Sequence, residues 1–128
     1  MVYLDTSVAL AHLRSEDRRP PDELWKESLV SSRLLEYELW TRLRSDRGGD
    51  RHEEAARKLL RRVGTLELMD PIVGRATEGF PVALRTLDAL HLASMLFLLD
   101  QGVEVRLASY DQRMRTAAEA VGVGLYPL

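Results

Sequence analysis

The first thirteen residues constrain the fold more than any other stretch of the chain. Residues 2–4 (VYL) form an apolar run without a polar break, typical of a strand buried on both faces of a parallel sheet. Asp5 follows, then the N-cap residue types Thr6 and Ser7, then apolar residues at helical spacing over 8–13. Because open α/β sheets bind ligands where their strands end, Asp5 is a candidate site residue. The alternative is that Asp5 only caps the helix.

Strand and helix patterns alternate along the rest of the chain. Strands are predicted over 28–32, 65–69, 103–109 and 123–128, and helices over 34–46, 52–63, 87–99 and 111–121, with shorter helices around Trp25 and before Glu78. Asp70 and Thr86 are expected to cap the helices that follow them. The alternation predicts an α/β fold, a three-layer α/β/α sandwich with a central, mainly parallel sheet. We expect residues 1–128 to form a single domain, because most domains have about 100 to 200 residues.

Composition excludes several functional classes. The chain has no cysteine, which removes disulfides, thiolate nucleophiles and cysteine zinc sites, and fits a reducing cytoplasm. A formal charge of -2 means that any attraction for nucleic acid must be local. Arginine far outnumbers lysine, which phosphate binding and a GC-rich genome would both explain. No secretory pattern precedes the first strand, and the apolar stretch 87–99 is too short to span a membrane, so no membrane partner is expected.

Four acidic residues fall at or beside the predicted element junctions. Asp5 ends the first strand, Asp88 lies in the first turn of the long apolar helix, Asp111 opens the helix after the fourth strand, and Glu38 borders an apolar helix face. An acid inside an apolar segment carries a desolvation cost unless something compensates it. That cost is the reason to consider the four acids together.

Each of these acids also has an ordinary structural explanation. Asp88 is favourable near the positive end of a helix dipole, and Glu38 has Arg42 as a potential partner four residues later. Asp111 would be a first-turn acid if Ser109 and Gln112 form a capping box.

If the four acids converge, raised pKa values or a cation must relieve their repulsion. Carboxylates without a histidine or cysteine ligand set suit Mg²⁺ or Mn²⁺ rather than zinc. Such ions also bind phosphate oxygens, which points to phosphodiester chemistry with an activated water. His12 and His52 are expected at the surface and His91 as a hydrogen-bonded core residue, and none of the three is expected to act in catalysis.

Four segments resemble, in order, the acidic blocks of PIN-domain ribonucleases, most closely the VapC-type toxins: YLDTSVAL, SSRLLEYELWTRL, LRTLDALHLASM and LASYDQRM. By position, the resemblance makes the catalytic residues and metal ligands Asp5, Glu38, Asp88 and Asp111. Glu38 is preferred to Glu36 because Ser32 precedes it by six residues and Arg42 follows by four. Many members have threonine where Ser109 stands.

The resemblance also implies an activity and partners. Such toxins are small endoribonucleases dependent on Mg²⁺ or Mn²⁺, form homodimers, and are neutralised by an antitoxin that covers the site. An RNA substrate would meet basic residues near the motifs, for which the candidates are Arg42, Arg44, Arg85, Arg113 and Arg115. Trp25 and Trp40 are candidates for a dimer or antitoxin interface, or for the core.

Three other functions are considered. The chain could be a non-catalytic PIN-like module that binds RNA or protein, or a solitary PIN nuclease without an antitoxin. A haloacid dehalogenase type of phosphatase also begins with a strand and an aspartate. That chemistry needs a second acid two residues later, where this chain has Ser7, so the phosphatase is disfavoured.

Overall fold

A five-stranded parallel sheet lies at the centre of the protein, in the computed structural model that describes residues 1–128. The strand order is β3-β2-β1-β4-β5, and every neighbouring pair is parallel. The strands are β1 (Val2–Leu4), β2 (Leu29–Ser32), β3 (Gly64–Leu66), β4 (Arg106–Ala108) and β5 (Gly124–Leu125). The first strand of the sequence is therefore the middle strand of the sheet, which explains its uninterrupted apolar run.

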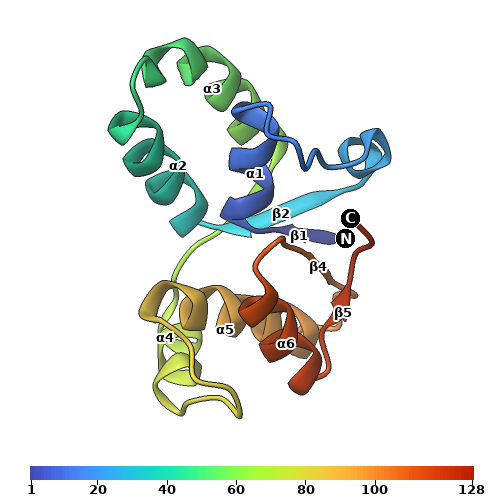
Figure 1. Cartoon of the computed structure of the whole chain (residues 1–128). Helices are drawn as coiled ribbons and strands as arrows, with labels where there is room; N and C mark the ends of the chain where they lie inside the picture. Colours follow the sequence, from blue (N-terminus) through green and yellow to red (C-terminus); the bar gives the residue numbers. More distant parts are fainter.

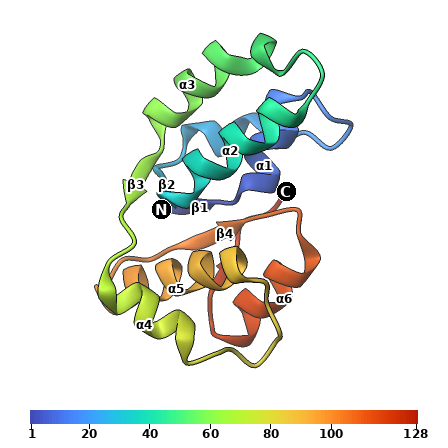
Figure 2. The ribbon, with the colours of Figure 1, turned by 90° about the vertical axis from the view of Figure 1, so that its left-hand side faces the viewer.

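Helices cover both faces of this sheet. Figure 2 shows α1 (Thr6–Leu13), α2 (Leu34–Ser45) and α3 (Glu53–Arg62) on one side of the strands, and α4 (Asp70–Thr77), α5 (Thr86–Asp100) and α6 (Gln112–Ala120) on the other. Two 3-10 helices, η1 (Asp22–Lys26) and η2 (Gly49–His52), lie in the connections. The expected α/β/α sandwich with a parallel sheet is confirmed. None of its helices has the length and apolar character needed to cross a bilayer.

Alternating side chains of β1 divide the core into two clusters. Val2 and Leu4 belong to a cluster of 16 buried residues that also contains apolar residues of α1, α2 and α3. Tyr3 belongs to a second cluster of 10 buried residues formed with α5, β4 and α6. Because successive strand residues point to opposite faces, three residues of β1 serve both layers. Trp25 and Trp40 are half-buried against the first cluster, which supports the core alternative for both.

The strand order places the ends of β1 and β4 side by side. Leu4 pairs with Ala108, and the Asp5 N–H donates to the Ala108 carbonyl at 3.0 Å. From β1 the chain builds outward to β2 and β3 and then returns to the other side of β1, so the direction of winding changes between β1 and β4 (Figure 1). Ligands of open α/β sheets bind beyond the strand ends at this point of reversal.

Several element boundaries differ from the sequence expectations. The cap of α4 is Met69 rather than Asp70, and the cap of α5 is Arg85 rather than Thr86, because the capping residue is the last one with extended backbone. The predicted strands 65–69, 103–109 and 123–128 shorten to two or three residues each, because pairing extends over three residues between β2 and β3, three between β1 and β4, and two between β4 and β5. The α2–α3 connection contains η2, which the sequence pattern did not predict.

Candidate active site at the carboxyl end of the sheet

Asp5 joins β1 to α1 and is 7% exposed. Its backbone is extended and its carboxylate accepts the Ser7 N–H at 3.4 Å, so Asp5 does cap α1. The carboxylate oxygen that accepts the Ser7 N–H, Oδ2, also accepts hydrogen bonds from the hydroxyls of Ser7 at 2.5 Å and Ser109 at 2.8 Å. Two hydroxyl bonds exceed what a helix cap needs, and they fix the carboxylate at the end of the sheet.

Ser109 links Asp5 to Asp111. The Ser109 hydroxyl is fully buried just after β4, where it donates to Asp5 and accepts the Asp111 N–H at 3.0 Å. Asp111 is the N-cap of α6, and its Oδ1 accepts the backbone N–H groups of Arg113 at 2.9 Å and Met114 at 3.3 Å. The alternative in which Ser109 and Gln112 form a capping box with Asp111 in the first turn is not realised, because Asp111 itself is the N-cap and α6 begins at Gln112.

Asp88 lies in the first turn of α5 with its side chain 15% exposed. Burial of the carboxyl is the main cause that raises the pKa of Asp88. Arg85 opposes this rise, whereas the negative charges of Asp111 and Asp5 add to it. Asp5 and Asp111, which come from two other elements, therefore lie within electrostatic reach of Asp88.

Arg85 provides the compensating charge. Its Nε lies 3.3 Å from Asp88 Oδ2, and its Nη2 lies 3.8 Å from Asp111 Oδ2. The Arg85 side chain is 71% exposed, so both pairs are accessible to solvent and each contributes little to stability. The sequence had suggested Arg85 only as a surface for RNA.

Glu38 lies on α2 and contacts His91 instead of Arg42, the partner that the sequence suggested. Its Oε1 lies 2.5 Å from Nε2 of His91, and its side chain is 15% exposed, whereas no ion pair joins it to Arg42. The rival acid Glu36 is 45% exposed and pairs with Arg33 at 2.8 Å. The structure thus turns Glu38 inward and Glu36 toward solvent.

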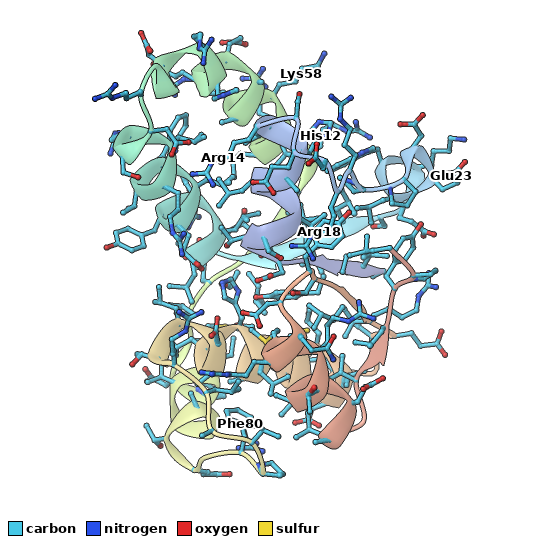
Figure 3. All side chains as sticks on the ribbon, viewed as in Figure 1. His12, Arg14, Arg18, Glu23, Lys58 and Phe80 are labelled. Carbon is cyan, nitrogen blue, oxygen red and sulfur yellow. The ribbon has the colours of Figure 1, made fainter.

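His91 is the buried partner of Glu38. The ring is 1% exposed, and its Nδ1 lies 2.8 Å from the Tyr3 hydroxyl. Burial of the ring lowers the pKa of His91, but Tyr3 and Glu38 outweigh burial and raise it, and Asp5 contributes in the same direction. The expectation of a hydrogen-bonded core histidine is confirmed. His12 lies in the last turn of α1 with its side chain at the surface (Figure 3), and His52 is half-buried.

The oxygen donors suit a hard divalent ion in kind. Carboxylates dominate, hydroxyls from Ser7 and Ser109 adjoin them, and the Thr6 hydroxyl is the one buried side-chain polar atom without a hydrogen-bond partner. No three acidic or histidine side chains are already close enough together to hold a metal ion. The structure brings Asp5, Asp88 and Asp111 to one edge, with Glu38 joined to that edge through His91.

A parallel sheet in this strand order, with acidic residues beyond its central strands, defines a PIN-like α/β protein. Residues 2–120 match the PIN domain family, so the chain belongs to the PIN-domain family.

Within this family the chain is similar to Ribonuclease VapC46 of Mycobacterium tuberculosis, with 33% identity covering 97% of this chain and 95% of that protein. It is also similar to Ribonuclease VapC47 of the same organism, with 31% identity over 95% and 93%. The expected resemblance to VapC-type ribonucleases is confirmed.

The fold has a counterpart among solved structures. The crystal structure of VapBC2 from Rickettsia felis, bound to a DNA fragment from their promoter, contains a chain that superposes with a TM-score of 0.71. The match covers 98% of each chain at 13% sequence identity. This likeness shows that the two chains share a fold.

Proposed function

We propose that this protein is a metal-dependent endoribonuclease that acts as the toxin of a toxin–antitoxin pair. The observation that carries the proposal is the placement of Asp5, Asp88 and Asp111 beyond the central strands, where the Ser109 hydroxyl joins Asp5 to Asp111 and Arg85 lies between Asp88 and Asp111. The charges of Asp111 and Asp5 add to the rise that burial causes in the pKa of Asp88. Carboxylates that repel one another in a sparsely hydrated site are stabilised by a cation. The ribonuclease names of two relatives support RNA as the substrate.

Asp5, Glu38, Asp88 and Asp111 would hold Mg²⁺ or Mn²⁺. When bound, such a cation supplies positive charge beside the scissile phosphate and makes water a better nucleophile. The residues of the chain orient this centre: Ser7 and Ser109 fix Oδ2 of Asp5, and the cap geometry of α6 fixes Oδ1 of Asp111. Arg85 stands exposed at the rim, where a guanidinium can bind a phosphate oxygen of the substrate.

The test is cleavage of a structured RNA by the purified protein in Mg²⁺ or Mn²⁺. Asp5→Asn and Asp88→Asn should each abolish cleavage, because each removes a charge that would bind the ion. Asp17→Asn, an exposed acid in the α1–η1 loop, is the matched control and should cleave normally. Full activity of both site variants would rule the mechanism out. RNA binding without cleavage by the wild-type protein would favour the non-catalytic module.

An antitoxin and a second copy of the chain are the proposed protein partners. Support for the antitoxin comes from the VapC names of the relatives and from a structural neighbour determined as VapBC2. The lack of cysteine is compatible with the proposed cytoplasmic location. A short adjacent gene for a DNA-binding protein that blocks RNA cleavage would support the toxin role, and its absence would favour a solitary nuclease. Light scattering of the free chain tests the homodimer.

A further inference from the structure

A buried hydrogen-bond network runs through the apolar core to Glu38. Tyr3, Ser32 and His91 are 0%, 2% and 1% exposed, and they come from β1, β2 and α5. The Tyr3 hydroxyl lies 2.8 Å from His91 Nδ1, with the Ser32 hydroxyl 3.4 Å from the same nitrogen. The other ring nitrogen, Nε2, lies 2.5 Å from Glu38 Oε1. This network therefore connects the central strands β1 and β2 to Glu38 on α2.

The hydrogen-bond partners of the His91 ring determine that its Nε2, the nitrogen beside Glu38, carries a proton. The Glu38 carboxylate can only accept a hydrogen bond, so the proton between it and the ring lies on His91 Nε2. The Tyr3 oxygen accepts the Ser32 N–H at 3.1 Å, and its hydroxyl can donate to Nδ1 of a neutral ring or accept from a charged one. A neutral ring that accepts at Nδ1 carries its proton at Nε2, and a charged ring carries one there as well. In both protonation states His91 therefore donates to the Glu38 carboxylate.

A free glutamate side chain has several rotatable bonds, and ordering it costs conformational entropy. The bond from His91 orders Glu38 before any ligand arrives. The His91 ring itself cannot rotate freely, because Tyr3 packs edge-on against it with ring centroids 5.8 Å apart and planes at 84°. An apolar residue would fill the same place without the cost of desolvating an imidazole. Burying His91 therefore costs desolvation free energy that simple packing of the core would avoid.

We propose that His91 is a positioning residue, which holds the Glu38 carboxylate toward the acidic site while Tyr3 and Ser32 hold the ring. This inference rests on the proposed function, because it assigns Glu38 to the ion. Residues that orient a metal ligand through a hydrogen bond change metal affinity or activity by about 10-fold to 100-fold when they are replaced. His91 is expected to belong to this group.

Two replacements of His91 separate its two bonds. A glutamine places an amide N–H near the position of Nε2, so His91→Gln keeps a donor for Glu38. An asparagine places its amide near Nδ1, so His91→Asn keeps a partner for Tyr3 and loses Glu38. Ser94→Ala is the control, because Ser94 is fully buried on the same helix and bonds only to the Leu90 carbonyl.

The experiment is calorimetric titration of each folded variant with Mn²⁺, alongside RNA cleavage. Glu38→Gln should weaken Mn²⁺ binding. His91→Asn should lower Mn²⁺ affinity by about 10-fold to 100-fold, and the double variant should bind no more weakly than Glu38→Gln alone. His91→Gln should restore most of the affinity, and Ser94→Ala should equal the wild type. If His91→Asn does not fold, Tyr3→Phe provides the second test, with a smaller loss in the same direction.

The outcomes distinguish the two proposals. Suppose that Glu38→Gln binds Mn²⁺ weakly while His91→Asn, or Tyr3→Phe if His91→Asn does not fold, binds it as tightly as the wild type. This result would overturn the role of His91 and leave the proposed function standing. Equal losses in His91→Asn and His91→Gln would also overturn it, since the bond to Glu38 would then be irrelevant. Absence of Mn²⁺ binding in the wild type would overturn both.

Discussion

The Ser109 hydroxyl donates a 2.8 Å hydrogen bond to Asp5 Oδ2 across 104 positions of sequence. The parallel register of β1 and β4 makes this contact, because Leu4 and Ala108 are paired and the next residue of each strand follows at the same edge. The same hydroxyl accepts the Asp111 N–H, so one buried serine orders two acids of the candidate site.

Removal of this hydroxyl should therefore affect both stability and activity. Ser109→Ala leaves the Asp111 N–H without its partner and Asp5 with one bond fewer, and we expect a loss of about 1–3 kcal/mol in the free energy of unfolding. Ser109→Thr keeps the hydroxyl and should retain most of both properties. Urea denaturation measures the loss, and Ser45→Ala, at an exposed serine, should change the free energy by less than about 0.5 kcal/mol. A Ser109→Ala protein as stable as Ser45→Ala would contradict the linkage.

Asp111 has a structural role as a helix cap and a proposed role as a ligand, and two substitutions separate them. Asp111→Ala should cost about 1 kcal/mol of stability, because Oδ1 no longer accepts the N–H groups of Arg113 and Met114. Asp111→Asn preserves the cap and should be close to the wild type in stability. Both should weaken Mn²⁺ binding, since both remove the charge. Thermal unfolding with and without Mn²⁺ checks the prediction, and normal ion binding by Asp111→Asn would remove Asp111 from the ligand set.

The connection between α2 and α3 requires glycine at position 49. A Cβ there would lie 1.7 Å from the Leu43 carbonyl oxygen, so Gly49→Ala must displace backbone and should destabilise the protein by about 1–3 kcal/mol. Gly74 within α4 has no atom within 4 Å of the corresponding position. Gly74→Ala should instead stabilise the helix by about 0.5–1 kcal/mol. Opposite signs in chemical denaturation are expected, and a neutral Gly49→Ala would be inconsistent with the close approach.

The environment of His12 predicts a pH dependence away from the acidic site. His12 is at the surface, but its ring packs against Trp25, and this partial burial lowers the pKa of His12 below its ordinary value of 6.5. Arg19 and Arg62 lower the pKa further, and Asp22 opposes them. A histidine with a lowered folded-state pKa costs no stability while it is neutral, and it destabilises the fold as pH falls from 6.5 through that lowered value. The protein should lose stability over this interval, and His12→Gln should lose less.

The same titration has an optical readout. The His12 ring lies 4.3 Å from the Trp25 ring, so charging the imidazole should change Trp25 fluorescence, measured in Trp40→Phe, where Trp25 is the sole tryptophan. The midpoint should fall below pH 6.5. A midpoint above that value would contradict the assigned cause. Persistence of the same pH-dependent fluorescence change in His12→Gln would contradict it as well.

Local patterns predicted the elements because they depend on residues close in sequence. The apolar run before Asp5 defines a central strand, and the helical spacing of 34–46 defines a helix that ends within one residue of Ser45. The partner of Glu38 could not be predicted in this way. His91 lies 53 residues away, and the two meet only because α2 and α5 cover opposite faces at the same edge. The pairing of Arg85 with Asp111 depends on tertiary structure for the same reason.

The central claim is that folding gathers carboxylates from separate elements into one site that binds a divalent cation. Calorimetric titration with Mn²⁺ of the wild-type protein, Asp5→Asn, Asp88→Asn and the loop control Asp17→Asn tests it most directly. We predict saturable binding by the wild type and by Asp17→Asn, and no measurable binding by the other two. Binding by Asp88→Asn equal to that of the wild type, or no binding by the wild type, would contradict the claim.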